Sequence, residues 1–428
     1  MNKDIKKNLF EFIYSSQPEH QEYIEFLEYE IHERVYYYGD QFKNHRDNKS
    51  VLSKIKFWYK HFKVIIYTLT LSILNKKKLD KKFGLSSSYL NYDEQLESND
   101  LIIDRSPWAP KLGRPMNISI NDYLKFLKID YRLNFYNTYD LISLKNIESI
   151  KEFKSFFKEY VIKNNYSFLI VPGDLDFWSR IAISVFNELN MPSICVAHGW
   201  MPSEYVGVSD SKVSHTAKWG EFEKNAYINS SFNPNNITTI GHPSYKLNFQ
   251  NLKFSFENIL VLTKSMAGVV LAKEKFIEDR GNTIMYLMAI QNVLEDLEIK
   301  NVFLRPHPCE NFDWYKSFID TDFFIEDKQD LHKSLQSKTL VIGPKSTTLV
   351  DSVAHGVNYV IFEPVIDNKD ILGSSISEPI DGSNEHIPVA SNTKQLNEIL
   401  VNKRPLNSKA FGKILNSPFD VDFLNKVL

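Results

Sequence analysis

The sequence has very little cysteine. Only Cys195 and Cys309 occur among its 428 residues, and two distant cysteines make neither a disulfide framework nor a zinc cluster. They fit a reducing compartment, so we expect a cytoplasmic protein. The first residues, MNKDIKKNLFEF, lack the apolar region and small-residue cleavage site of a secretory signal, which agrees with this expectation.

An excess of charge of one sign is also absent. The 51 Lys and Arg residues nearly balance the 53 Asp and Glu residues, for a formal net charge of −2. A protein that acts mainly on nucleic acid favours a clearly basic domain, so we expect no nucleic-acid partner. The length of 428 residues and the hydrophobic content of 43% are instead typical of a globular protein with two domains.

Long hydrophobic runs are missing too. The most apolar stretch, residues 64–74, is well short of the ~20 residues that span a bilayer. Lysines flank it on both sides, and two interpretations stay open: a buried helix with solvated lysines at its ends, or a segment lying on the inner face of the cell membrane. We expect residues 1–100 to be mainly helical in either case.

Short apolar runs that alternate with helical patterns fill the rest of the chain. One set of runs lies at 167–171, 193–197 and 237–241, with a helical pattern at 177–189; after a polar link at 244–255, a second set lies at 258–263, 301–304, 323–325, 339–342 and 359–362, with a long helix at 273–297. Such alternation indicates parallel sheets covered on both faces. We predict an α/β protein with two doubly wound, Rossmann-like domains that face each other across a cleft.

This pattern divides the chain into an N-terminal domain over 1–245, a C-terminal domain over 256–405 and a helical segment over 406–428. In open parallel sheets, ligands bind outside the carboxyl ends of the strands. The residues directly after each predicted strand are therefore the candidates for a functional site.

The sharpest motif is Arg305-Pro306-His307-Pro308, directly after the run at 301–304. The two prolines stop both strand and helix and fix the backbone around the histidine. His307 could then donate a hydrogen bond to a phosphate oxygen and, when protonated, offset the charge of a departing nucleotide; Arg305 would bind the same phosphate. A proline-rich turn with a capping histidine is the alternative.

A second motif follows the run at 339–342, namely Gly343-Pro344-Lys345-Ser346-Thr347-Thr348-Leu349-Val350-Asp351. Its three hydroxyl residues crowd a predicted helix N-terminus, where free backbone N–H groups favour an anion. Lys345 would add positive charge, and Asp351 could accept hydrogen bonds from a ribose. An ordinary N-cap of a buried helix is the alternative.

Two weaker candidates follow other strands of the same pattern. Lys264 and Ser265 come after the run at 258–263 and could contact a donor phosphate or a substrate carboxylate, although a solvated loop explains them equally well. Gly241-His242-Pro243 lies where the chain leaves the first domain. We interpret it as a hinge or cleft floor, with His242 as a weak candidate for donor binding.

Candidates for a general base lie in the first domain. Asp174 and Asp176 follow the run at 167–171, and His198 follows the run at 193–197. Carboxylates and an imidazole at adjacent strand ends could deprotonate a hydroxyl nucleophile. Asp174 could instead cap the next helix, and His198 could be a turn residue.

No metal site is predicted. Asp174-Leu175-Asp176 has the spacing of a cation-binding DxD motif, but it lies in the domain expected to hold the acceptor. Backbone N–H groups, hydroxyls and an imidazole can stabilise a monophosphate leaving group without a metal ion. We therefore expect no metal and no cofactor beyond the substrates.

The order of these motifs resembles glycosyltransferases of the GT-B fold. It consists of a strand followed by His198-Gly199, then GHP at 241–243, RPHP at 305–308, GPKSTTLVD at 343–351 and HGVNYVIFEP at 355–364. Among these enzymes, the sequence looks most like the bacterial sialyltransferase and capsule polysaccharide transferase groups, which carry a histidine-proline motif and a Ser/Thr pair. The resemblance covers residues 167–364.

The resemblance implies roles for individual residues. His307 with Ser346 and Thr347 would bind the phosphate of a CMP-sugar, and Asp174 or Asp176 would be the general base. The usual acidic pair followed by glycine is replaced here by Gly173-Asp174-Leu175-Asp176. Glu363, after the last predicted strand, would contact the ribose or the base of the nucleotide.

The function implied is transfer of a nonulosonic acid (sialic, pseudaminic, legionaminic or Kdo-like) from its CMP donor to a hydroxyl of a bacterial capsule or lipopolysaccharide glycan. The expected partners are a nucleotide-sugar donor and a glycan or glycolipid acceptor, with peripheral contact to the inner membrane as one option. A CDP-alditol transferase of the teichoic-acid type, in which His198 would be the base, a UDP-sugar transferase, and a non-catalytic scaffold of a polysaccharide assembly complex are the alternatives.

Overall fold

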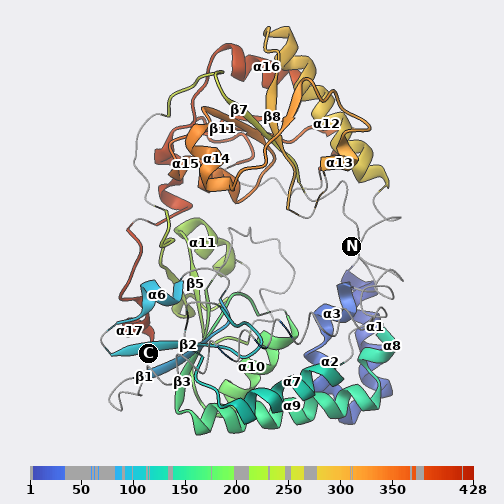
Figure 1. Ribbon diagram of the computed structural model, residues 1–428, viewed down its shortest axis with the longest axis vertical. Coiled ribbons are helices and arrows are strands. Elements are labelled where there is room, and N and C mark those ends of the chain that lie inside the picture. Colours follow the sequence, from blue (N-terminus) through green and yellow to red (C-terminus); the bar gives the residue numbers. More distant parts are fainter. Residues whose placement is uncertain are drawn as a thin grey trace.

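Two six-stranded parallel sheets form the frame of the protein, one above the other in the view of Figure 1. They are seen in a computed structural model that describes residues 3–33, 59, 62, 66, 82–88, 92–98, 100–111, 114, 116–133, 138–174, 176–196, 212–229, 232–245, 252–264, 277–308, 310, 312–366, 369–372, 380–416 and 418–428. Each sheet has a buried hydrophobic cluster on either side of it. Layers of helices on both faces of a parallel sheet produce this pattern.

The N-terminal sheet contains β1 (Lys82–Ser86), β2 (Leu101–Arg105), β3 (Tyr166–Val171), β4 (Ser193–Val196), β5 (His215–Lys218) and β6 (Ile237–Thr239). Its strand order is β2-β1-β3-β4-β5-β6, with every pair parallel. The chain therefore builds outward from β1 to β2 and then continues on the other side of β1 with β3. This reversal between β1 and β3 is the topological switch point of the sheet.

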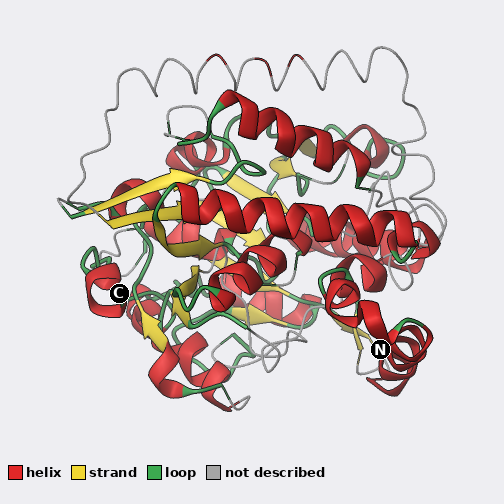
Figure 2. Ribbon diagram, turned by 90° about the horizontal axis from the view of Figure 1, so that it is seen from below, coloured by secondary structure: helices red, strands yellow, loops and turns green. Residues whose placement is uncertain are grey.

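The helices of the N-terminal half are α1 (Lys3–Ser16), α2 (Gln21–Glu25), α3 (Glu28–Glu33), α6 (Tyr92–Leu96), α7 (Ile120–Arg132), α8 (Thr138–Leu141), α9 (Leu144–Lys163), α10 (Phe177–Glu188) and α11 (Glu221–Asn229), with short 3-10 turns η1 (Pro18–His20) and η5 (Pro234–Asn236). Figure 2, seen from below, shows long helices lying over the strands. In α9, Ile147, Ile150, Phe153 and Phe157 recur every three or four residues and are all buried. This spacing forms the apolar face of the helix, which packs against α7 and α10.

The N-terminal helices α2 and α3 contact α9 and α10 through charged pairs. Arg180 Nη1 lies 2.8 Å from Glu28 Oε2, and the Lys154 ammonium pairs with Glu22 and with Glu188. No helix in the described part of the chain is long and apolar enough to cross a membrane. Apart from Ile66, the apolar stretch at 64–74 lies outside the described residues.

The C-terminal sheet contains β7 (Ile259–Leu262), β8 (Val302–Arg305), β9 (Phe324–Glu326), β10 (Leu340–Gly343), β11 (Asn358–Phe362) and β14 (Val389–Ala390), while β12 (Val365–Ile366) and β13 (Lys369–Asp370) form a separate antiparallel pair. Its order is β14-β11-β10-β7-β8-β9, all parallel. Numbered in chain order, this is 3-2-1-4-5-6 from the β9 edge, the order of a dinucleotide-binding Rossmann sheet. The switch point lies between β7 and β10.

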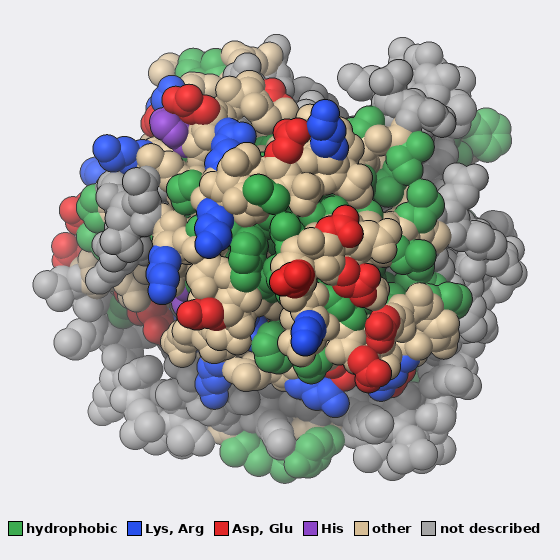
Figure 3. Space-filling view, turned by 90° about the horizontal axis from the view of Figure 1, so that it is seen from above, with side chains coloured by type: hydrophobic (Ala, Val, Ile, Leu, Met, Phe, Trp, Pro, Cys, Tyr) green, Lys and Arg blue, Asp and Glu red, His purple; other side chains and the backbone are tan. Residues whose placement is uncertain are grey.

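The helices around this sheet are α12 (Ile277–Asp296), α13 (Phe312–Tyr315), α14 (Leu331–Ser337), α15 (Thr348–Ala354) and α16 (Thr393–Val401). Polar caps begin two of them: the Asp330 carboxylate accepts from His332 N, and the Asn392 side chain accepts from Gln395 N. Seen from above in Figure 3, the outer face of this domain carries acidic and basic side chains side by side among hydrophobic ones. This mixture agrees with the near-zero net charge.

The end of the chain returns to the N-terminal domain after the turn η6 (Ser408–Lys413) and ends in α17 (Phe423–Val427), which Figure 1 shows beside β1 and β2. Asn416 N donates to Trp219 O at 2.7 Å, and Asp420 N donates to Ile240 O at 2.8 Å. Gly241 permits this approach, because it has φ +74° and a Cβ there would lie 2.2 Å from Asn416 O. The segment at 406–428, predicted as a helical C-terminal piece, contains the 3-10 turn η6 and the short helix α17.

The prediction of an α/β protein with two doubly wound, Rossmann-like domains is confirmed, and the strands predicted from apolar runs all form within a few residues of their expected bounds. Strands β1, β2, β5 and β14 of the two large sheets were not predicted, and neither was the antiparallel pair of β12 and β13. Residues 82–86, expected to be helical, form β1 instead. These segments (KFGLS, LIIDR, HTAK and VA) are short or mostly polar, and they become strands because neighbouring strands and helices bury them.

Candidate functional site

The carboxyl ends of β8, β7 and β10 bring the main sequence candidates to one edge of the C-terminal sheet. His307 follows β8 and Ser346 follows β10, and only β7 separates these two strands. Strands in a sheet are spaced about 4.8 Å apart, so the backbones of the two loops lie on the order of 10 Å from each other. The edge is also the switch point of the sheet, where ligands of Rossmann domains bind.

Hydrogen bonds from its backbone N–H hold His307 in place. Its N–H donates to Thr263 Oγ1 at 3.1 Å and to Glu310 Oε2 at 2.9 Å, and the Thr263 hydroxyl also bonds the Glu310 carboxylate. These contacts tie the loop after β8 to the end of β7. Burial lowers the pKa of His307 below 6.5, so its imidazole is mainly neutral at pH 7. The charge predicted for this histidine would therefore arise only when an anion beside it raises the pKa again.

The loop after β10 is anchored by side chains in and directly after β11. Lys345 N donates to Glu363 Oε1 at 2.5 Å, and Tyr359 Oη donates to Pro344 O at 2.6 Å. Gly343 allows this packing, because a Cβ there would lie 2.3 Å from the Tyr359 hydroxyl. Gly343 and the buried Glu363, both predicted to touch the nucleotide, are thus engaged in holding the loop. Lys345 itself is half-buried at the edge.

The hydroxyl-rich turn at Ser346 differs from the predicted anion-binding helix start. Thr348 N donates to Ser346 Oγ at 3.3 Å, Leu349 N to Ser346 O at 3.0 Å, and Val350 N to Thr347 O at 2.9 Å. The helix that follows, α15, has seven residues. Because the N–H groups of Thr348, Leu349 and Val350 are bonded within the turn, an anion here would be bound mainly through the Lys345 ammonium and the hydroxyls of Ser346, Thr347 and Thr348.

Two predicted phosphate or ribose contacts are directed elsewhere. Arg305 Nη1 bonds Asp327 Oδ2 at 3.1 Å and Gln329 O at 2.6 Å, on the side of β9 and away from β7. Asp351 is buried, and its Oδ1 accepts from Tyr245 Oη at 2.5 Å. The sequence could not place either partner, since both come from loops outside the motifs. Lys264 is half-buried after β7, and Ser265 lies outside the described residues.

The acidic candidates of the N-terminal sheet divide into two roles. Asp176 is the N-cap of α10, where its carboxylate accepts from Ser179 N at 3.1 Å and from Ser179 Oγ at 2.6 Å. The Asp174 side chain is partly exposed and makes no hydrogen bond to any described residue. Val171 pairs with Cys195, so the loop that carries Asp174 follows β3 beside the end of β4. Burial, with the Asp174 carboxylate as second cause, raises the pKa of Cys195 to about 12. His198 is outside the described residues.

A cluster of aromatic side chains lies where the chain passes from the N-terminal to the C-terminal domain. His242, after β6, stacks on Tyr245 with ring centroids 3.9 Å apart and meets the edge of Trp219 at 4.8 Å. Trp219 Nε1 donates to the Tyr92 hydroxyl at 2.6 Å. Burial, with a smaller effect from His332, lowers the pKa of His242 to about 4. His242 of the GHP motif is thus buried in this ring cluster.

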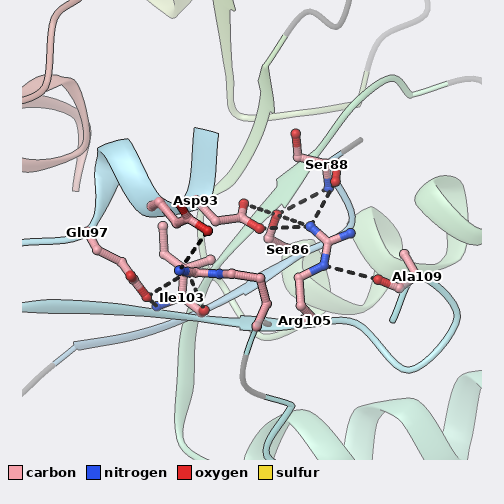
Figure 4. A network of polar contacts seen from close by, with 9 residues as sticks. Ser86, Ser88, Asp93, Glu97, Ile103, Arg105 and Ala109 are labelled. Atoms are coloured by element: carbon pink, nitrogen blue, oxygen red, sulfur yellow. Dashed lines mark hydrogen bonds and ion pairs between the residues drawn. The ribbon is translucent and has the colours of Figure 1, made fainter. Parts of the chain in front are cut away.

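A second polar cluster lies at the ends of β1 and β2. Arg105 Nη1 bonds Asp93 Oδ2 and Ser88 O, both at 2.8 Å, and Arg105 Nε donates to Ala109 O at 3.0 Å. The Ser86 hydroxyl donates to the other Asp93 oxygen at 2.6 Å. Figure 4 shows the guanidinium group enclosed by these partners. Arg105 and Asp93 form a buried ion pair that fixes the loop after β1.

Within the described ranges, no group of three or more His, Cys, Asp or Glu side chains is arranged to hold a metal ion.

The chain is similar to several solved structures of sugar-nucleotide enzymes. They include the UDP-GlcNAc 2-epimerase of Methanocaldococcus jannaschii in complex with UDP-GlcNAc and UDP (TM-score 0.46, 15% identity, 81% of this chain and 98% of that chain covered). The lipopolysaccharide outer core galactosyltransferase WaaB (0.45, 8%, 81% and 99%) and Anabaena HepE in complex with UDP (0.42, 10%, 81% and 98%) are two others. No family model and no curated protein matches the sequence. The function proposed below therefore rests on the geometry of this chain alone.

Sequence reasoning missed Thr263, Glu310 and the Ser86–Asp93–Arg105 cluster. Glu310 stands three residues after His307, a spacing at which an acidic side chain can cap the turn of its own loop. This signal was available in the sequence. The serines after β1 gave none, because the strand itself was not predicted.

Proposed function

We propose that this protein is a glycosyltransferase that uses a nucleotide-activated donor. The observation that carries the proposal is the convergence of the His307, Thr263 and Lys345 loops at the switch point of a sheet with Rossmann strand order. In such sheets the phosphates of a nucleotide lie at this edge. Asp174, at the corresponding edge of the other sheet, supplies a carboxylate that makes no hydrogen bond to any described residue.

The donor that we favour is a CMP-linked nonulosonic acid, on an acceptor in a bacterial surface glycan. The phosphate of a CMP-sugar carries one negative charge, which the Lys345 ammonium can compensate while the His307 imidazole N–H and the hydroxyls at 346–348 donate hydrogen bonds. His307 would donate one hydrogen bond to a phosphate oxygen. As CMP departs, its added negative charge would raise the pKa of the imidazole and favour the protonated form.

The chemical step requires one proton acceptor. Asp174 would take the proton of an acceptor hydroxyl while the oxygen of that hydroxyl forms a bond to the anomeric carbon of the donor sugar. The bond from that carbon to the phosphate oxygen breaks, and its electron pair leaves with CMP. His307 and Lys345 stabilise the charge on the leaving group.

A UDP-sugar donor is the second candidate. Lys264 after β7 and Lys345 after β10 flank the switch point, and two ammonium groups could compensate the extra charge of a diphosphate. The same two lysines would serve a CDP-alditol.

A thermal-shift panel of CMP, CDP and UDP tests the proposal. A nucleotide at 100 times its Kd stabilises the folded state by about 2.7 kcal/mol, which raises the melting temperature by roughly 3–5 °C in a protein of 428 residues. We expect a shift with CMP. A shift with UDP or CDP but not CMP changes the donor class, and no shift with any nucleotide contradicts a transferase and favours a scaffold.

Two histidine variants localise the effect. His307→Ala should abolish the nucleotide shift without lowering the melting temperature of the free protein. His386→Ala is the matched control, because His386 is exposed and precedes β14, at the opposite edge of the same sheet. If a nucleotide raised the melting temperature of both variants equally, His307 would not be part of the nucleotide site.

A further inference from the structure

The first turn of α10 is held by the N-terminal helices. Phe177 N, at the start of α10, donates to Glu30 Oε1 of α3 at 3.0 Å. Three residues later, Arg180 Nη1 donates to Glu25 O at 2.5 Å and to Glu28 Oε2 at 2.8 Å. Segments that lie 147 to 155 positions apart in the chain therefore meet at the start of this helix.

Two carboxylates share the N–H groups of this helix start. Asp176 accepts from Ser179 N at 3.1 Å as the N-cap, while Glu30 accepts from Phe177 N. The first N–H groups of a helix have no partner within the helix, and the helix dipole favours negative charge beside them. Glu30 therefore completes the N-terminal cap of α10 from a distant part of the chain.

The loop before α10 carries Asp174, the proposed base. It begins after Val171, which pairs with Cys195 of β4, and it ends at Asp176, where α10 begins. Between these two ends, the Asp174 side chain is partly exposed and makes no hydrogen bond to any described residue. A Cβ atom added at Gly173 would have no neighbour within 4 Å. The position of the Asp174 carboxylate thus depends on how the two ends of its loop are held.

A general base has to be placed accurately. It acts only within hydrogen-bond reach of the proton that it removes, about 2.6–3.2 Å. A displacement of about 1 Å at a reacting group can cost a factor on the order of 10² in rate. Because Asp174 stands just before Asp176 and Phe177 in the chain, a shift at the start of α10 passes directly to it. The hydrogen bond from Phe177 N to Glu30 therefore controls one end of the loop that carries the base.

We propose that Glu30 is a positioning residue for the transfer: by holding the start of α10, it fixes the place of the Asp174 carboxylate. This assignment rests on the function proposed above, in which Asp174 is the general base. The helices α1–α3 carry none of the motifs found at the strand ends. Through Glu30 and α10, they nevertheless act on the reaction.

Glu22→Ala is the matched control for Glu30→Ala. Glu22 lies on α2 and pairs with Lys154 of α9, which also pairs with Glu188 at the other end of α10. Its loss removes a carboxylate and an ion pair from the same N-terminal helices without touching the first turn of α10. Glu30→Gln keeps a side-chain oxygen that accepts from Phe177 N, so it separates the hydrogen bond from the charge.

Hydrogen exchange of the full chain tests the contact without any substrate. Peptides that cover residues 172–180 report on the Asp174 loop and on the first turn of α10. We expect Glu30→Ala to speed exchange in these peptides about tenfold, Glu30→Gln to restore most of the protection, and Glu22→Ala to change it by less than about twofold. Glu30→Asp, whose carboxylate is one methylene group shorter, should give an intermediate rate and carries the test if Glu30→Ala does not fold. Exchange that is unchanged in both Glu30→Ala and Glu30→Asp, or raised equally by Glu22→Ala, overturns the proposal.

Release of CMP from CMP-N-acetylneuraminate, with water as the acceptor, measures the effect on the reaction. Asp174 takes a proton from the water, the water oxygen bonds to the anomeric carbon, and CMP leaves with the electron pair of the broken bond. We expect Glu30→Ala to lower kcat about tenfold and to leave KM for the donor unchanged, because the other domain binds the nucleotide. In a protein that already carries Asp174→Asn, Glu30→Ala should cost less than about twofold, since Glu30 acts through Asp174. Equal losses with and without Asp174→Asn indicate a merely structural role and overturn the proposal.

The two proposals fail in different ways. CMP release that falls in Asp174→Asn but not in Glu30→Ala counts against the role of Glu30 alone. Release that is unaffected by Asp174→Asn counts against the proposed base, and against the role of Glu30 with it. No release by the unmodified protein counts against N-acetylneuraminate as the donor sugar, and the exchange rates then decide the role of Glu30 on their own.

Discussion

The hydroxyl of Tyr245 donates a hydrogen bond to Asp351 Oδ1 at 2.5 Å and so connects the segment after β6 to α15 of the C-terminal domain. Both groups are buried where the chain passes from one domain to the other. The Asp351 carboxylate raises the pKa of Tyr245 in addition to the larger effect of burial. Tyr245 also stacks on His242, so this single side chain links the ring cluster to the second domain.

Loss of the Tyr245 hydroxyl should destabilise the protein. Tyr245→Phe leaves the buried Asp351 carboxyl without its donor, and we expect a loss of about 1–3 kcal/mol in the free energy of unfolding, read from urea titrations. Tyr131→Phe, at a half-exposed position, should change it by less than about 0.5 kcal/mol. Identical urea midpoints for the two variants would show that the bond contributes nothing.

Acid should destabilise the joint through His242. Burial lowers its pKa from 6.5 to about 4 in the folded protein. Below pH 6.5 the unfolded chain therefore binds a proton that the folded chain refuses, so stability falls as the pH drops from 6.5 towards 4 and is fully present above 6.5. The difference amounts to as much as roughly 3 kcal/mol.

His242→Asn tests this dependence, because its side-chain oxygen can still accept from Ser244 N. The slope of unfolding free energy against pH between 6.5 and 4 should become shallower in the variant. Asp351 acts in the opposite sense: burial raises its pKa, so its contribution is present below pH 3.8 and is lost as the pH rises through the raised pKa. Since Asp351, His332 and His355 remain in both proteins, the difference in slope isolates His242. Parallel curves would contradict the assignment.

The two acidic residues after β3 should behave differently on mutation. Asp174→Asn should lower the transfer rate by about 10²–10⁴-fold without changing nucleotide binding, because a general base is removed. Asp176→Asn retains a good N-cap, and Asp176→Ala should cost about 1 kcal/mol of stability with a smaller effect on rate. Steady-state transfer assays and thermal melts distinguish the two. A rate unaffected by Asp174→Asn would exclude it as the base.

Three glycines differ in backbone strain and in contact, and so test how tightly the C-terminal segment packs against Gly241. Gly241→Ala combines φ +74° with a contact of 2.2 Å to Asn416 O, whereas Gly356→Ala has the same φ in open space and Gly173→Ala has neither problem. We expect losses in the order Gly241, Gly356, Gly173, with about 1 kcal/mol for the strained but open position. Thermal melts rank the variants, and a neutral Gly241→Ala would show that the returning segment can shift.

The sequence predicted the sheets better than the contacts of the site. Buried parallel strands such as 167–171 and 339–342 are continuous apolar runs, so both Rossmann-like domains could be identified from them. β5 reads HTAK and carries no such signal, because its neighbours provide the burial. His307 and Ser346 reach one edge as expected, since the rule for strand ends depends only on strand order.

The partners of single side chains could not be predicted in the same way. Which of Asp174 and Asp176 caps α10 depends on where the helix begins, and sequence patterns locate such ends only to within a few residues. Asp351 is bonded to Tyr245, 106 positions earlier in the chain. Nothing local to the GPKSTTLVD motif indicates that partner.

The return of the chain after η6 affects how the protein can be made. Phe423 and Leu424 are fully buried in the same hydrophobic cluster as Tyr92, Ile103 and Phe168 of the N-terminal domain. A ribosome adds these two residues only after it has synthesised the whole C-terminal domain. The N-terminal domain is therefore synthesised first but completes its hydrophobic core last. A fragment that ends before residue 423 would expose part of this hydrophobic core to chaperones.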